Sequence, residues 1–123
     1  MSEVKSYRDL IVWQKGMDLA ESAYALAKLL PRSEEYRLTS QLLRAAASIP
    51  ANIAEGNARS ARKDYAHFIS IARGSVAEVE TFLQLAVRVQ LVSPDEVSVA
   101  LGLADELGRM LNVMRDRLSK NPD

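Results

Sequence analysis

Every long apolar pattern in this chain has the period of a helix, and none alternates in the way that a strand does. Four such segments are separated by Pro31, by Gly56-Asn57 and by Ser93-Pro94, which are residue types that end or begin helices. The connections are only a few residues long, so consecutive helices should run antiparallel. The pattern therefore predicts an all-α fold, an antiparallel up-down-up-down four-helix bundle.

Length and composition agree with one soluble domain. The chain has 123 residues, of which 48% are apolar and 26% charged. We expect a single domain over residues 1–123, with flexible ends at 1–8 and 120–123. No apolar run reaches the roughly 18 residues that span a bilayer, the first residues do not resemble a signal peptide, and cysteine is absent. We expect a cytoplasmic protein with no membrane partner.

The helix bounds follow from apolar stripes and capping residues. The first helix should run from about Asp9 to Leu30, with an inward stripe made of Leu10, Trp13, Met17, Ala20, Tyr24 and Ala27. The second should begin at the cap Ser33 and end near Glu55. The third should run from Ser60 or Ala61 to about Gln90. Ser93-Pro94-Asp95-Glu96 is a capping box that opens the fourth helix.

Pro50 and Gly74 interrupt the expected helices. Pro50 deletes one backbone hydrogen bond and should bend the second helix near Ala46 to Ser48. A complete break at Ile49 is the alternative, but the side-chain pattern stays in phase across the proline, which favours one bent helix. Gly74 lies inside the third helix, and a close approach by another helix would explain it.

A polar line follows one face of the second helix, made of Gln41, Arg44, Ser48, Asn52 and Glu55 at steps of three or four residues. Beside it runs an apolar line, made of Leu42, Ala45, Ala46, Ile49 and Ile53. We interpret the polar line as part of a structural network with Arg73, Glu78 and Glu80 of the third helix. The alternative is a recognition surface formed by Arg44, Asn52 and Arg73.

Residues suited to catalysis are scarce. His67 is the only histidine, so no paired-histidine metal site can form, and the surroundings of His67 in the sequence favour a surface or interface position. There is no glycine-rich phosphate loop. We expect neither an enzyme nor a bound cofactor or metal.

The formal net charge is zero, but the charges are unevenly spread. Arg59, Arg62 and Lys63 cluster at the start of the third helix, where they are unfavourably placed for the helix dipole. They could belong to a solvated loop, or they could bind the phosphates of RNA or DNA.

The apolar surface exceeds what a monomeric bundle needs. Nine apolar residues fall outside the main stripes: Ile11, Leu19, Leu26, Leu43, Ile71, Phe82, Leu85, Val89 and Val92. Together they predict a second buried surface, and therefore self-association.

Several blocks resemble one bacterial family. The segment 7–15, with the sequence YRDLIVWQK, the segment 40–46, with SQLLRAA, the segment 48–56, with SIPANIAEG, and the segment 71–80, with IARGSVAEVE, are similar to the 23S rRNA-intervening sequence protein family. The accessory variability protein of diversity-generating retroelements is a related branch. The resemblance implies a four-helix bundle that assembles as a ring-shaped homopentamer. In the retroelement branch it also implies binding of nucleic acid and of a reverse transcriptase.

Residues and resemblance together predict a non-enzymatic, oligomeric four-helix bundle protein that acts as a nucleic-acid-binding adaptor. The alternative is a structural or protein-interaction module, which would have a protein partner and no nucleic-acid role.

Overall fold

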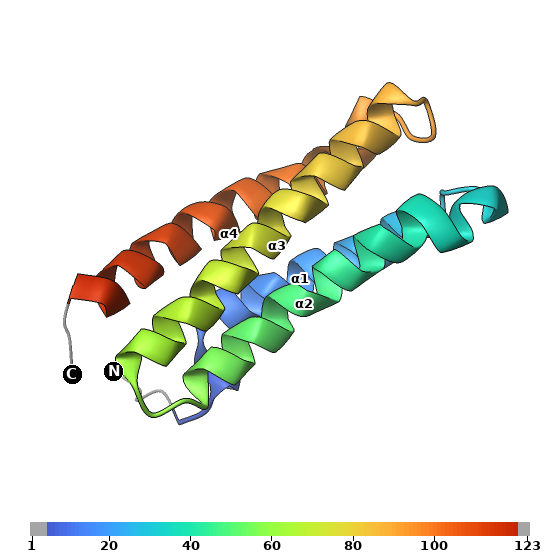
Figure 1. Ribbon diagram of the computed structural model, residues 1–123. Helices are drawn as coiled ribbons and strands as arrows, with labels where there is room; N and C mark the ends of the chain where they lie inside the picture. The colour runs from blue at the N-terminus through green and yellow to red at the C-terminus, as the bar shows by residue number, and fades with distance from the viewer. Residues whose placement is uncertain (1–4, 121–123) are drawn as a thin grey trace.

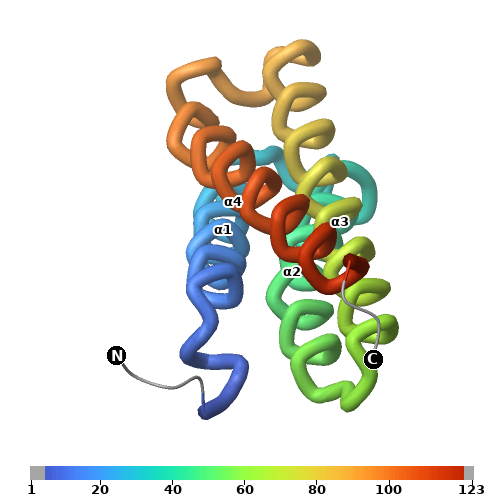
Figure 2. Tube along the Cα trace, turned by 90° about the vertical axis from the view of Figure 1, so that its left-hand side faces the viewer, coloured from blue at the N-terminus to red at the C-terminus, as the bar shows by residue number. Residues whose placement is uncertain are grey.

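Four long helices make up the fold. The computed structural model describes residues 5–120, in which α1 spans Ile11–Ala27, α2 Ser40–Asn57, α3 Arg62–Arg88 and α4 Pro94–Lys120. Figure 1 shows each helix running opposite to the one before it. The chain is therefore an all-α bundle, as predicted. The first and last described residues lie at the same end of the bundle as the α2–α3 connection (Figures 1 and 2).

The core lies between all four helices. The apolar line predicted on α2 is confirmed, because Leu42, Ala45, Ala46, Ile49 and Ile53 are all buried. They share one core with the buried face of α3, which includes Ile69, Val76 and Val79, and with that of α4, which includes Ala104, Leu107 and Leu111. Each helix thus buries one face, which is the main source of bundle stability. No helix within residues 5–120 is both long and apolar enough to cross a bilayer.

The helix ends near residue 90 have clear local causes. The predicted capping box is confirmed: the Ser93 amide donates to Glu96 Oε1 at 2.8 Å, and the Glu96 amide donates to Ser93 Oγ at 3.2 Å. At the end of α3, Gln90 has a φ of 63°, and the Leu91 amide donates to the Ala86 carbonyl at 2.9 Å. This is the left-handed helix end that glycine usually forms.

The inward face predicted for the first helix is confirmed only in part: Leu10, Trp13 and Ala20 are half-buried against the core, but the fully buried face lies beside them. The buried residues of α1 are Val12, Gly16, Leu19, Ala23 and Leu26, whereas Met17 and Tyr24 are about half exposed. A Cβ on Gly16 would lie 3.3 Å from the Ile49 side chain, so α1 approaches α2 closely along a face of small residues. Met17 and Tyr24 of the predicted stripe therefore lie on a second, outer face of α1.

The second helix begins later than predicted. Ser33 does not cap α2; a 3-10 turn at Arg32–Glu34 and a π turn at Glu35–Thr39 precede it. The backbone leaves helical geometry at Arg37, which separates these turns from the regular helix. From Ser40 onward α2 is a single helix through Pro50, so the alternative of a break at Ile49 is wrong. The bend near Ala46 to Ser48 remains a prediction.

Two glycines have opposite surroundings. A Cβ on Gly56 would lie 2.9 Å from both Phe68 Cβ and Tyr65 Cδ1, so the absence of a side chain lets the end of α2 approach α3. A Cβ on Gly74 would meet nothing within 4 Å, so the predicted close approach at Gly74 is wrong. Gly74 lies on the exposed face of α3.

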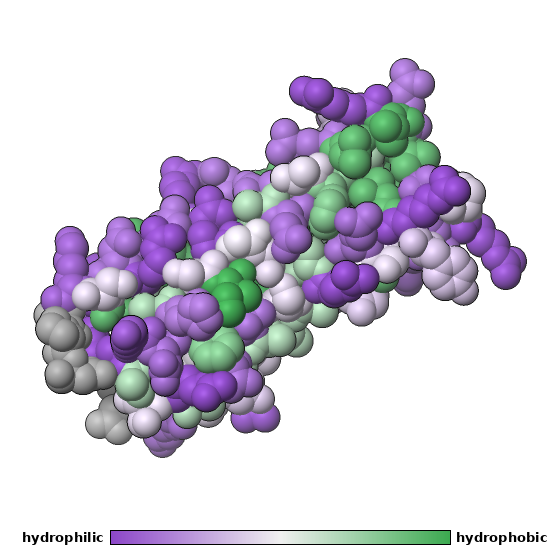
Figure 3. Space-filling model, in the orientation of Figure 1, coloured by the Kyte–Doolittle hydropathy of each residue, from purple (hydrophilic) through white to green (hydrophobic). Residues whose placement is uncertain are grey.

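Part of the predicted surplus apolar surface is exposed. Leu19, Leu26 and Val92 belong to the core, and Leu43 and Phe82 are half-buried. The other four residues of that set, Ile11, Ile71, Leu85 and Val89, are exposed. Figure 3 shows apolar surface gathered over the C-terminal part of α3. Apolar residues outside the core are therefore concentrated on particular faces.

The predicted flexible ends are partly outside the described residues, since residues 1–4 and 121–123 are not described. Tyr7 and Arg8 belong to a 3-10 turn at Tyr7–Asp9, whose cap is Ser6, and Lys120 is the last residue of α4.

Candidate nucleic-acid interface

Arg59 lies in the connection between α2 and α3, where it is anchored by two contacts. Its Nη2 atom is 3.0 Å from Glu55 Oε2, and its guanidinium lies over the Phe68 ring at 4.8 Å from the centroid. The side chain is still 46% exposed, so it can meet an approaching anion without breaking the stacking contact.

Arg62 and Lys63 begin α3 and have different roles. Arg62 donates from Nη2 to the Arg117 carbonyl at 3.1 Å, which links the first turn of α3 to the last turns of α4. Lys63 is exposed and makes no ion pair with any residue from 5 to 120. Arg62 therefore helps to hold α3 against α4, whereas the Lys63 ammonium is available to a ligand.

One end of the bundle is basic although the whole chain is neutral. The antiparallel fold brings together the start of α1, the α2–α3 connection and the end of α4 (Figure 2). Among the described residues, the cations of this end are Lys5, Arg8, Arg59, Arg62, Lys63, Arg115, Arg117 and Lys120, and its anions are Asp9, Glu55, Asp64 and Asp116. The net charge hides this difference between eight cations and four anions, because the other residues of the chain contribute eight cations and twelve anions, Glu3 and Asp123 among the latter.

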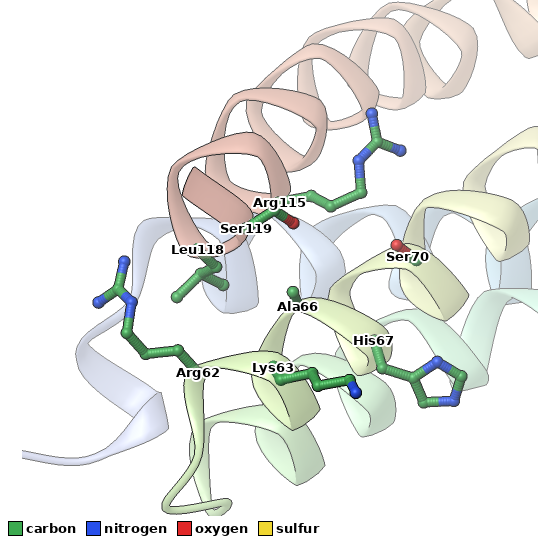
Figure 4. Close-up of a pocket in the computed structure, with 8 residues that line it drawn as sticks. All are labelled: Arg62, Lys63, Ala66, His67, Ser70, Arg115, Leu118 and Ser119. Carbon is green, nitrogen blue, oxygen red and sulfur yellow. The ribbon is translucent and has the colours of Figure 1, made fainter. Parts of the chain in front are cut away.

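A pocket lies within the basic end, between the first turns of α3 and the last turns of α4 (Figure 4). Its volume is about 570 Å³, and it is lined by Arg62, Lys63, Ala66, His67 and Ser70 of α3 and by Arg115, Leu118 and Ser119 of α4. None of these described lining residues is acidic. His67 and Arg115 were not among the site residues predicted from the sequence. An alignment of the start of α3 with the end of α4, as antiparallel neighbours, would have placed both residues near Arg62 and Lys63.

The polar line of α2 lines a second groove, of about 280 Å³, between α2 and α3. Gln41, Arg44, Ser48 and Asn52 share it with Glu78. Ser48 Oγ is hydrogen-bonded to the buried Ser75 Oγ, and Asn52 donates from Nδ2 to the Ser48 carbonyl at 2.7 Å. Four members of the predicted network thus share a groove with Glu78, and the hydrogen bonds within this groove centre on Ser48.

The remaining members of the predicted network lie elsewhere. Glu55 pairs with Arg59, as described above. Arg73 turns towards α4, where its Nε donates to Asn112 Oδ1 at 3.2 Å and its guanidinium covers Gly108. Glu80 is half-buried outside the groove, and Gln84 donates to its backbone carbonyl. Arg73 therefore joins α3 to α4 and not to α2.

Tyr65 lies beside the basic end, half-buried between α2 and α3. Burial raises the pKa of its hydroxyl above the ordinary value, and a hydrogen bond from Asn57 Nδ2 at 3.2 Å lowers it in part. Within the described residues, no three His, Asp or Glu side chains gather closely enough to hold a metal ion. The chemistry that the basic end offers is therefore binding of anions through cations and hydroxyls.

The fold and the basic end define a class, that of small all-α bundles with a basic surface at one end. A family model described as 23S rRNA-intervening sequence protein matches residues 8–113. The chain belongs to this family, as its sequence blocks predicted.

A solved structure shares the fold. The crystal structure of a protein of unknown function from the S23 ribosomal protein family of Bacteroides thetaiotaomicron superposes with a TM-score of 0.80 at 25% sequence identity. The match covers 85% of this chain and 98% of that one. No curated protein matches the chain.

Proposed function

We propose that this protein is a non-enzymatic, oligomeric adaptor that binds nucleic acid, and RNA in particular, through the basic end of its bundle. The observation that carries the proposal is the excess of eight cations over four anions at that end. Clustered cations from several chain segments attract a polyanion even when the net charge is zero, because charges farther away than about 8 Å are largely screened at physiological salt. The family description refers to 23S ribosomal RNA, which makes RNA the first nucleic acid to test.

Self-association would place several basic ends in one particle. The outer face of α3 has exposed residues at helical spacing, namely Ile71, Gly74, Glu78, Leu85 and Val89. The outer face of α1 has Met17 and Tyr24, and it borders an apolar groove of about 380 Å³ shared with Pro50 and several alanines of α2. Both helices pack on α2 and α4, so the two faces lie at different corners of the bundle.

Two different faces favour head-to-tail association, in which each copy presents its α3 face to the α1 face of the next. Such contacts close into a ring when the rotation between copies allows it. The homopentamer implied by the family resemblance is an assembly of this type. A ring would also multiply weak RNA contacts, because linked sites raise the effective concentration of the ligand.

RNA retention on filters tests the nucleic-acid role. The parent protein should retain structured RNA at low salt, about 50 mM, and the logarithm of its affinity should fall linearly with the logarithm of the salt concentration. Arg59→Ala combined with Lys63→Ala should weaken binding several-fold. The same double substitution should make this slope shallower by about 2, or roughly 1 for each phosphate that is no longer neutralised.

The matched control removes the same charge from the opposite end. Lys28→Ala combined with Arg88→Ala deletes two exposed cations of the same two types. RNA affinity should then stay within about twofold of the parent value, because these cations lie far from the basic end. Equal reductions in the two double variants, or no retention by the parent at low salt, would reject the basic end as the site.

A protein-interaction module without a nucleic-acid role is the second candidate. The exposed apolar faces of α1 and α3 favour it, because they suit a different protein as well as a second copy of this chain. This candidate predicts no RNA retention at any salt concentration, and a partner that competes with self-association.

A further inference from the structure

The pocket between α3 and α4 has the size and chemistry of a small-ligand site. Its volume of about 570 Å³ falls within the roughly 300–1,000 Å³ of typical ligand pockets and exceeds what a bare phosphate would fill. Ala66 and Leu118, which are 8% and 9% exposed, provide an apolar floor. The ligand that fits therefore has a carbon body in addition to a charged group.

Positive charge surrounds this floor. Figure 4 shows Arg62 at one end of the pocket and Arg115 on its α4 side, both with the guanidinium turned outward, and Lys63 and His67 side by side along its α3 side. Arg115 has one anionic neighbour, Asp116, at 3.4 Å from its Nε, and Arg62 is linked to the Arg117 carbonyl. Lys63 makes no ion pair with a described residue, and it lies near the positive end of the α3 dipole, where a cation is destabilising. A bound anion would offset this repulsion.

The donors around the pocket suit a phosphate. The ammonium of Lys63 and the guanidinium of Arg115 are groups that donate charge-assisted hydrogen bonds to phosphate oxygens, and the hydroxyls of Ser70 and Ser119 supply neutral donors from both helices. The imidazole of His67 offers a flat face on which a nucleic-acid base can stack. Phosphate donors, a stacking face and an apolar floor lie together in this one pocket.

We propose that this pocket binds a single nucleotide unit, with its phosphate held by Lys63 beside His67, its base over the apolar floor, and Arg115 adding positive charge on the α4 side. The inference rests on the proposed nucleic-acid role and extends it, because it names the part of the nucleic acid that the pocket binds. The unit belongs either to a single RNA strand or to a free nucleotide. Both sources share the same chemistry.

His67 makes the test direct, since it is the chain's only histidine and its imidazole C–H signals can be followed by proton NMR without assignment of other residues. Adenosine 5′-monophosphate should shift these signals saturably, and adenosine at the same concentration should not. A short single-stranded RNA that moves the same signals identifies the strand as the source, whereas a shift with the mononucleotide alone identifies the free nucleotide. Signals unmoved by both would overturn the proposal.

A substitution that fills the pocket distinguishes mononucleotide binding in the pocket from general electrostatic attraction to the basic end. Ser70→Trp places a large side chain at the exposed rim without changing any charge, and should weaken mononucleotide binding at least about tenfold. Ala77→Trp, at an exposed position of the same helix outside the pocket, should leave it unchanged. Lys63→Ala should weaken binding about tenfold, the effect of removing one charge-assisted hydrogen bond. Unchanged mononucleotide binding in Ser70→Trp would reject the pocket as the binding site. RNA retention without a shift of the His67 signals would also reject the pocket, but it would leave the proposed RNA-binding function intact.

Discussion

Gly56, which has no side chain, allows α2 and α3 to approach closely at the basic end of the bundle. Gly56 has no positive φ, so conformational freedom does not explain it. Its Cα instead lies against Tyr65 and Phe68, the latter being the ring on which Arg59 stacks. The position of Arg59 therefore depends on a residue that carries no functional group.

Gly56→Ala should lower the free energy of unfolding by about 1–3 kcal/mol, because the added methyl group would collide with the Tyr65 and Phe68 side chains of α3. Chemical denaturation of the parent and the variant would measure this change. Gly102→Ala is the control, since a Cβ there meets nothing within 4 Å, and it should raise stability by about 0.5–1 kcal/mol through helix propensity. A variant at position 56 as stable as the parent would show that the helices move apart without cost.

At the scale of the elements, α3 ends at a residue whose backbone conformation is one that glycine adopts more easily. Gln90 adopts a φ of 63°, a left-handed conformation that costs a residue with a Cβ about 1–2 kcal/mol. The hydrogen bond from the Leu91 amide to the Ala86 carbonyl keeps the chain in this turn.

Gln90→Gly should therefore raise the free energy of unfolding by about 1 kcal/mol, seen as a higher midpoint in thermal or urea denaturation. The same substitution inside α3, at the exposed Gln84, should have the opposite sign and cost about 1 kcal/mol. If both substitutions destabilised the protein, the helix would not end in the left-handed turn at residue 90.

Local sequence patterns predicted the helices well where a single pattern, such as a capping box or one apolar line, was clear. Ser93 and Glu96 form the capping box that their spacing indicated, and α2 continues through Pro50 because its apolar line stays in phase. The buried face of α1 was predicted only in part, for a physical reason. Both of its sides are apolar, and the buried side has small residues such as Gly16 and Ala23 that give a weaker pattern than Trp13 and Tyr24.

The candidate site was less predictable, because it depends on which helices are neighbours. Arg59, Arg62 and Lys63 could be singled out from their spacing alone. Arg115 and His67 join them only through the packing of α4 on α3, a contact between distant parts of the chain. Arg73 illustrates the same limit, since helical period placed it on α3 but did not show that it turns towards Asn112.

At the scale of the whole molecule, the charge and apolar surfaces occupy different places. Eight basic residues gather at one end of the bundle, whereas exposed apolar residues are spread along the helices, on α1 and α3 and, at Val99 and Val113, on α4. Association through the long sides would leave every basic end uncovered. Oligomer formation and RNA binding should therefore be separable by substitution.

Head-to-tail association makes a prediction that symmetric pairing does not. Leu85→Asp with Val89→Asp places charges on the α3 face, and Met17→Asp with Tyr24→Asp places them on the α1 face; all four residues are exposed, so the bundle itself should tolerate the changes. Each double variant alone should be monomeric by light scattering at micromolar concentration, because burying an unpaired carboxylate in an interface is costly.

An equimolar mixture of the two variants should form dimers, since the intact α1 face of one can bind the intact α3 face of the other, and assembly stops there. Val99→Asp, at an exposed position of α4, should leave the parent assembly unchanged. If each face paired with its own copy instead, either double variant alone would already be a dimer through its remaining face. Dimers in the unmixed samples, or a parent protein that is monomeric under the same conditions, would contradict head-to-tail association through α1 and α3.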